Sequence, residues 1–203
     1  MCGRYDLSEN PATIRARFHI SAVPEFAPNA DWRPTDRAPI IRRARESTDL
    51  ECVLARWGLV PWWAKDLKFG THTINARSET VATQPSFRDA FKARRCLVPV
   101  NAFYEWSGPK GHRTKWRIRV RDEGIFSLAG LWERWRDPES GEGLETYTII
   151  TTAANEAIAK LHDRMPVVLR PQDEERWLDP KATGKDLLVP FDPGGMAIEA
   201  GSL

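Results

Sequence analysis

The sequence predicts an α+β fold, in which several irregularly spaced strands combine with a few short helices. Apolar side chains alternate with arginines from Trp116 to Val120, and this period of two is typical of a half-exposed strand. Segments of helical composition are few and short. With 203 residues, 41% of them hydrophobic, the chain is long enough for one domain with a full core, spanning residues 1–203.

The first part of the chain predicts one helix followed by a loop. Asn10 is a favourable N-cap, and Pro11 is favoured as the first residue of a helix. Ile14 and Phe18 are four residues apart, so they supply one apolar face of a short helix. Four prolines then fall between residues 24 and 39, where they predict an extended surface loop.

The remaining elements are mostly strands. Their segments are rich in β-branched, aromatic and alternating residues. These predicted strands are residues 52–57, 96–100, 103–106, 116–120, 125–131 and 147–152. The first of them breaks into a Trp-rich loop at 58–63, and residues 107–111 predict a turn. Residues 155–161 and 171–177 predict two short helices.

The charges are balanced overall but unevenly distributed. A formal net charge of +2 points to no nucleic acid, membrane or acidic partner by itself. Residues 1–136 nevertheless carry 24 basic and 15 acidic side chains, whereas residues 137–203 carry 6 and 13. Arginine outnumbers lysine 22 to 8, and there are nine tryptophans. Guanidinium groups pair with phosphates and stack on flat rings, although a GC-rich genome and a Trp-rich core explain the same composition.

Several classes of protein are disfavoured. No segment approaches the roughly 20 apolar residues of a membrane-spanning helix, and the first residues lack the apolar run of a signal peptide. The three cysteines, Cys2, Cys52 and Cys96, form no CxxC motif, so a reducing cytosol is the simplest location. Cys52 and Cys96 lie in apolar segments and are expected in the core. Without clustered Cys and His residues, we expect no metal site and no cofactor.

Cys2 has the most distinctive chemistry in the chain. Because the second residue is small, an aminopeptidase is expected to remove Met1 and leave a free α-amine beside the Cys2 thiol. An α-amine has a pKa of about 8, so a useful fraction is neutral and nucleophilic at physiological pH. The amine can form a Schiff base with an aldehyde, and the thiol can then close a five-membered thiazolidine. An ordinary terminus without function also explains Cys2.

Four further side chains can carry chemistry. Asn75 can both donate and accept hydrogen bonds, and Arg77 can bind phosphate as a fork. Glu105 is flanked by aromatic residues, so desolvation is expected to raise its pKa and make it a candidate acid–base. His162 titrates near neutrality at a predicted helix end. The simpler alternatives are a surface turn with an Arg–Glu pair, a solvated Glu105 and a helix-capping His162.

Taken together, the motifs resemble one known family. The matching segments are ordered along the chain and are much more specific together than any one is alone. They are residues 1–4 (MCGR), 56–59 (RWGL), 61–63 (PWW), 75–80 (NARSET), 95–99 (RCLVP), 103–106 (FYEW), 129–132 (AGLW), 150–153 (ITTA) and 162–166 (HDRMP). In this order they resemble the SOS response-associated peptidase (SRAP) family.

The resemblance implies both a fold and an activity. The fold is an α+β domain whose twisted, mostly antiparallel sheets form a barrel-like core with short flanking helices. The activity is the sensing of abasic sites in single-stranded DNA and the formation of a covalent DNA–protein crosslink through Cys2. Asn75 would then hold the terminal residue, and Glu105 would manage the protons of the amine and the sugar ring. His162 would assist ring opening and reversal of the crosslink.

The resemblance also assigns residues to DNA binding. Arg4 and Arg77 look like phosphate ligands, Trp62 and Trp63 look like a wedge or stacking platform beside the lesion, and Thr151 is expected to support the pocket. The family takes its name from a self-processing peptidase activity that would expose the N-terminal cysteine. A monomer that acts on damaged DNA in the cytoplasm, at the nucleoid, is the expected form.

Two departures from the family pattern bear on the site. Asp31 stands where the family usually has Asn; a carboxylate there accepts hydrogen bonds but repels phosphate. Residues 191–203 do not show the usual terminal segment. Two other functions remain open, namely a peptidase or amidohydrolase with a cysteine nucleophile, and a non-catalytic module that binds single strands. Finally, the uneven charges predict arginine-rich segments lining a groove to Cys2, with acidic residues of the last third facing away.

Overall fold

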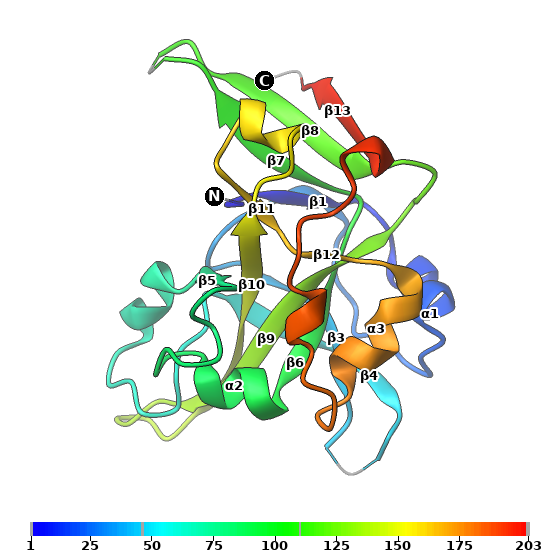
Figure 1. Ribbon diagram of the computed structural model, residues 1–203. Helices are drawn as coiled ribbons and strands as arrows, with labels where there is room; N and C mark the ends of the chain where they lie inside the picture. Colours follow the sequence, from blue (N-terminus) through cyan, green and yellow to red (C-terminus); the bar gives the residue numbers. More distant parts are fainter. Residues whose placement is uncertain (1, 46, 110, 202–203) are drawn as a thin grey trace.

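The computed structural model describes residues 2–45, 47–109 and 111–201, and within them it confirms the α+β expectation (Figure 1). Strands dominate, and they form two sheets. The three α-helices of this part of the chain are short: α1 (Pro11–Phe18), α2 (Arg88–Ala93) and α3 (Pro171–Leu178). None of the helices in the described ranges is long and apolar enough to cross a membrane.

The larger sheet contains a closed ring of strands. The ring members are β3 (Arg37–Arg43), β4 (Leu50–Trp57), β6 (Arg95–Val100), β9 (Phe126–Arg136) and β10 (Gly143–Ala153). Their order is β10-β4-β3-β6-β9, and a further pairing of β9 with β10 closes it. Closure removes the exposed edges of a sheet, so the expected barrel-like core is confirmed. Three short strands flank the ring: β5 (Asn75–Arg77), β11 (Arg164–Pro166) and β12 (Val168–Leu169).

The smaller sheet lies across one end of this barrel, at the top of Figure 1. Its order is β13-β8-β7-β1-β2, and every neighbouring pair is antiparallel. The strands are β1 (Tyr5–Leu7), β2 (Asn29–Trp32), β7 (Ala102–Ser107), β8 (Thr114–Val120) and β13 (Met196–Ala200). The first strand therefore lies between β2 and β7, close behind the N-terminal residues.

Buried aromatic rings join the two sheets. Tyr5 of β1 lies 5.2 Å from Trp57 of β4, and Trp57 stacks on Tyr147 of β10 at 6.2 Å between ring centroids. The hydroxyl groups of Tyr5 and Tyr147 are hydrogen-bonded at 2.7 Å, which satisfies both polar groups inside the core. This cluster fixes β1 on the barrel, and with it the position of the residues that precede β1.

Two of the predicted elements are wrong. The loop predicted between the prolines at 24 and 39 contains β2 and the start of β3. Pro39 has no N–H to donate, but β3 and β6 pair only where Ile41 faces Leu97, so Pro39 is tolerated inside the strand. The helix predicted over 155–161 is a single 3-10 turn, Ile158–Lys160, which Asn155 caps by accepting a hydrogen bond from the amide of Ile158.

Candidate functional site

The first strand delivers Cys2 to a fully buried position, and the side chains around it, Asn75 and Glu105, define the Cys2 pocket. In the pairing of β1 with β7, Tyr5 faces Phe103, and the amide of Tyr104 donates to the carbonyl of Arg4 at 3.0 Å. This antiparallel course brings Cys2 next to Glu105, and Cys2 has no exposed surface. Burial, and secondly the negative charge of Glu105, raise the pKa of the Cys2 thiol far above its usual range. The thiol is therefore protonated in this state.

Asn75 holds the backbone of Cys2. It begins β5, which runs parallel to β10 with Asn75 opposite Ile149. Its Nδ2 group donates a hydrogen bond of 2.9 Å to the carbonyl oxygen of Cys2. Its Oδ1 atom is buried and has no hydrogen-bond partner within the described ranges. A buried acceptor without a donor is costly, so Asn75 Oδ1 is available for an N–H or O–H group that enters the pocket.

Glu105 is an almost fully buried carboxyl group. It lies on β7 with 3% of its surface exposed, so the alternative of a solvated Glu105 is wrong. Burial is the main cause that raises the pKa of Glu105, and the negative charge of Asp163 adds to it. The predicted direction of the shift is thereby confirmed. A carboxyl group with a raised pKa can both donate and accept a proton near neutral pH.

His162 follows the 3-10 turn and is half-buried. Burial is the main cause that lowers its pKa, against the opposing charge of Asp163. Its Nδ1 atom accepts a hydrogen bond of 3.0 Å from the amide of Arg164 and lies 2.8 Å from Oδ1 of Asp163. Nδ1 therefore lies between a backbone donor and a carboxylate; when Asp163 holds the proton on Nδ1, Nε2 is the ring nitrogen that can accept a proton.

Asp31 is the local counter-ion of two arginines. Its carboxylate accepts from Nη1 of Arg4 at 3.2 and 3.3 Å, and Oδ2 also accepts from Nη2 of Arg33 at 2.6 Å. The expectation that it accepts hydrogen bonds is confirmed. Arg4 additionally lies over the ring of Trp106, 5.4 Å from the centroid. Arg77, in contrast, is exposed at the end of β5 and makes no ion pair with any residue in the described part of the chain.

Arg164 is a positioning residue that reasoning from the sequence missed. Its guanidinium forms two hydrogen bonds with Glu79, at 2.5 and 3.0 Å, and a third with the carbonyl of Thr151 at 2.7 Å. The bonds from Arg164 lower the pKa of Glu79 to about 2. Thr151 is fully buried beside β5, and its hydroxyl donates to the carbonyl of Ala76 at 3.5 Å. The HDRMP motif was the available signal for Arg164.

The tryptophan loop begins where β4 ends. Trp62 and Trp63 are 63% and 43% exposed, and they are the only exposed large aromatic side chains among the described residues. The two ends of the loop meet at Gly58 and Gly70, where a Cβ atom on Gly58 would lie 2.3 Å from the carbonyl oxygen of Gly70. Trp57 Nε1 donates to the carbonyl of Ile74, the residue before Asn75. The hydrogen bond from Trp57 to Ile74 thus connects the start of the tryptophan loop to the strand that begins with Asn75.

The expected separation of charges is wrong in its simple form. Many acidic side chains of the last third neutralise arginines of the first two-thirds by direct ion pairs. These pairs are Arg17–Glu174, Arg42–Glu145, Arg43–Glu175, Arg45–Glu145 and Arg119–Glu199. Asp163 also belongs to the last third, and it lies at the site beside His162. A sum over the sequence cannot distinguish paired from unpaired arginines.

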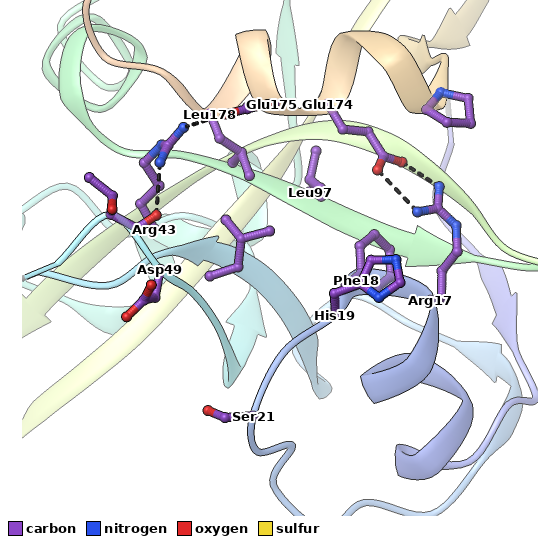
Figure 2. A pocket seen from close by; sticks show the side chains of 13 residues that line it. Arg17, Phe18, His19, Ser21, Arg43, Asp49, Leu97, Glu174, Glu175 and Leu178 are labelled. Carbon is purple, nitrogen blue, oxygen red and sulfur yellow. Dashed lines mark hydrogen bonds and ion pairs between the residues drawn. The ribbon is translucent and has the colours of Figure 1, made fainter.

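A cavity of about 650 Å³ lies elsewhere, between α1, α3 and the β3–β4 hairpin (Figure 2). None of the predicted site residues lines it. Arg17 spans it to reach Glu174 at 2.7 and 3.2 Å, and Arg43 is directed toward Glu175. Arg17 and Arg43 are thus paired with Glu174 and Glu175, whereas Nε of Arg43 is buried without a hydrogen-bond partner in the described ranges. In the described ranges no group of three His, Cys, Asp or Glu side chains is placed to hold a metal ion.

Comparisons with known proteins agree on one family. The model of the family described as "SOS response associated peptidase (SRAP)" matches residues 1–199. The abasic site processing protein YoqW of Bacillus subtilis (strain 168) is 40% identical over 206 positions, which cover 97% of this chain and 90% of that protein. The abasic site processing protein HMCES of Gallus gallus is 29% identical, with 88% of this chain and 66% of that protein covered.

Solved structures share the fold. A crystal structure of a protein from Bacteroides thetaiotaomicron has 31% sequence identity and a TM-score of 0.85, with 98% of this chain and 91% of that chain covered. A protein from Bordetella bronchiseptica has 27% identity and a TM-score of 0.85, with both chains covered completely.

Proposed function

The chain belongs to the SRAP family, and from that premise we propose that it captures abasic sites in single-stranded DNA as a covalent thiazolidine on Cys2. An abasic site is in equilibrium with a ring-opened aldehyde, which is the electrophile that an amine and a neighbouring thiol capture together. One observation carries the proposal. Asn75 holds the backbone of Cys2, and the buried carboxyl group of Glu105 lies next to it, which supports Cys2 as the nucleophile and Glu105 as the acid–base.

The first chemical step requires a free α-amine on Cys2. Met1 itself lies outside the described residues, and its removal remains part of the proposal. The neutral amine attacks the aldehyde carbon, a C–N bond forms, and the carbonyl oxygen takes up a proton to give a carbinolamine. Before this attack the sugar ring opens: His162, whose lowered pKa favours the neutral ring, accepts the proton of the anomeric hydroxyl, and the ring oxygen takes up a proton as its C–O bond breaks.

Glu105 then carries one proton through the second step. Burial raises the pKa of Glu105 and so favours the protonated carboxyl group, which can donate to the carbinolamine hydroxyl as this leaves as water. The positive charge of the resulting iminium favours ionisation of the nearby thiol. As sulfur attacks the iminium carbon and the C–S bond closes the ring, the thiol proton returns to Glu105. The net change is amine, aldehyde and thiol to thiazolidine and one water.

The surrounding residues hold the strand. Arg4 and Arg77 supply guanidinium groups for the phosphates beside the lesion. Trp62 and Trp63 offer exposed rings on which unpaired bases stack. Thr151 acts from inside the pocket, since it has no exposed surface and supports β5. Cys2, Asn75 and Glu105 come from one chain, which supports activity as a monomer, and we place that activity in the cytoplasm, at the nucleoid.

The test is a crosslinking assay with purified protein whose Met1 has been removed. Incubation with an oligonucleotide that carries one abasic site is expected to give a shifted band on a denaturing gel. Cys2→Ser keeps the amine but lacks the thiol, so its adduct is expected to remain a Schiff base that appears only after borohydride trapping. The absence of any band from the wild-type protein would refute the proposal.

A self-processing peptidase is the second candidate, and the position of Glu105 beside Cys2 is the observation that favours it. The same carboxyl group could assist attack of Cys2 on the preceding peptide bond. Expression of Glu105→Gln in cells without aminopeptidase activity toward Met1 separates self-processing from removal of Met1 by a host enzyme. Mass spectrometry is expected to find Met1 retained in the variant and lost from the wild type if the chain processes itself.

A further inference from the structure

Near the site there are two pairs of arginines, and the two members of each pair lie on neighbouring strands or at their ends. Tyr5 pairs with Trp32 in the β1–β2 register, and Arg4 and Arg33 follow on the same side, bridged by Asp31. In the β3–β4 register Arg37 lies directly opposite Arg56. Like charges directly opposite each other destabilise a sheet unless an anion lies between them.

The second pair has no such anion among the residues that the structure describes. Neither Arg37 nor Arg56 makes an ion pair within residues 2–45, 47–109 and 111–201, and Nη1 of Arg56 is buried without a hydrogen-bond partner. Burial lowers the pKa of Arg56. The nearest acid along the chain, Asp36, accepts a hydrogen bond from the backbone amide of Arg33 at 2.8 Å. Arg37 is exposed, so one side of the pair is open to solvent.

A short turn connects this pair with the Cys2 pocket. Residues 33–36 join β2 to β3, and the amide of Thr35 donates to the carbonyl of Trp57 at 2.9 Å. In return the amide of Trp57 donates to the carbonyl of Asp36 at 2.9 Å. The turn is thereby fixed to the end of β4, where the tryptophan loop begins. On the other side, a Cβ atom on Gly70 would lie 2.9 Å from Nη1 of Arg56.

These contacts connect the two arginine pairs. Along the backbone, the turn 33–36 connects Arg33, which shares Asp31 with Arg4, to Arg37 opposite Arg56, and β4 then continues into the loop that carries Trp62 and Trp63. We propose that the Arg37–Arg56 pair is a phosphate subsite for the strand that contains the lesion, one that follows the contact at Arg4. This inference rests on the proposed function, because it assumes that the lesion sugar lies at Cys2.

The distinction between the two pairs supports this assignment. At Arg4 and Arg33 a DNA phosphate must compete with the carboxylate of Asp31, whereas at Arg37 and Arg56 the phosphate would supply the missing counter-ion. A guanidinium pair without its own acid binds a phosphate with less electrostatic opposition. Arg37 is exposed and can reach a phosphate, and the half-buried Arg56 adds a second positive charge directly opposite it.

The experiment measures reversible binding of single-stranded oligonucleotides that carry a stable abasic analogue without an aldehyde. Single phosphates on either side of the analogue are replaced, one at a time, by uncharged methylphosphonates. Wild type, Arg37→Gln and the matched control Arg15→Gln are compared. Arg15 is an exposed residue of α1, which lies on the opposite side of the molecule from the N-terminus (Figure 1). Both variants remove one exposed charge and leave the buried core unchanged.

We expect one phosphate position whose neutralisation weakens wild type and Arg15→Gln about five-fold but leaves Arg37→Gln unchanged. The slope of log affinity against log salt is expected to fall by about 0.7 in Arg37→Gln, the value for one phosphate contact on a single strand. If Arg37→Gln responds at every position as Arg15→Gln does, the inference is wrong. The readout needs no covalent step, so a failure of crosslinking overturns only the proposed function.

Discussion

The Cys2 pocket and the cavity between α1 and α3 differ in how their polar and charged side chains are paired. In the cavity, Arg17 and Glu174 form two hydrogen bonds, and Ser127 donates a third to the carboxylate at 2.6 Å. In the pocket, Asn75 Oδ1 has no donor within the described ranges, and burial shifts the pKa values of Cys2 and Glu105 upward. The main ion pair of the cavity is thus satisfied, although Nε of Arg43 there is buried without a partner in the described ranges; in the pocket the desolvated groups are the titratable ones themselves.

The functional region is recognised by its buried titratable groups and its unpartnered acceptor, and not by the size of a cavity. A large hollow shows only that packing is incomplete, whereas desolvated titratable groups and an unpartnered acceptor retain free energy that a substrate can release. The same reasoning separates the arginines. Exposed arginines without an acidic partner among the described residues, such as Arg37 and Arg77, are available to an anionic strand, whereas Arg17 is held by Glu174.

The strongest test of the comparison is Glu105→Gln. The amide cannot carry a proton through iminium formation, so crosslinking is expected to slow about 100-fold, within the range for loss of a general acid–base. Because the pKa of Glu105 is raised, its protonated form persists toward neutral pH and is lost as pH rises through that pKa. Rate measurements across pH are expected to show a falling limb at high pH in the wild type only.

An unchanged pH profile in Glu105→Gln would show that the buried carboxyl group is structural. The control is circular dichroism of both proteins at each pH, which separates a loss of catalysis from unfolding. The rising limb at lower pH comes from deprotonation of the α-amine, so it is expected in both proteins.

The next test addresses the cavity. Glu174→Gln removes the charge that binds Arg17 while preserving the size of the side chain, so Arg17 loses its charged partner. The free energy of unfolding is expected to fall by about 2 kcal/mol, the scale for hydrogen bonds to a charged group. Urea unfolding measures this loss. Crosslinking by the folded variant is expected to equal that of the wild type, and a slower reaction would contradict a purely structural role for the cavity.

Reasoning from the sequence was most successful where a local pattern sets the structure. The cap at Asn10, the alternating strand before Val120 and the aromatic neighbours of Glu105 each depend on residues close in the chain. The closed barrel and the meeting of Cys2 with Asn75 came instead from the family resemblance, because no local pattern encodes a contact across 73 residues.

The features that were missed depend on strand register and on long-range pairing. β5 is three residues long and pairs with β10, and Arg164 joins Glu79, just after β5, to the carbonyl of Thr151 in β10. The role of Asp31 as a counter-ion follows from an irregular β1–β2 register that places it next to Arg4. The predicted separation of charges failed for the same reason, since distant acids pair with arginines that the sequence sum counted as free.

The smallest expected effect is that of Asp31→Asn on the affinity for single-stranded DNA, because Arg4 is both paired with an acid and proposed to bind phosphate. Asp31→Asn removes the carboxylate that Arg4 and Arg33 share, while Arg4 keeps its contact with Trp106. With less repulsion, affinity for single-stranded DNA is expected to rise about three-fold at low salt and to approach that of the wild type at high salt. The pair is partly exposed, so stability is expected to fall by less than about 1 kcal/mol. Weaker binding by Asp31→Asn in a salt titration would instead mean that orienting Arg4 outweighs the repulsion, and that Asp31 belongs with the satisfied ion pairs of the fold.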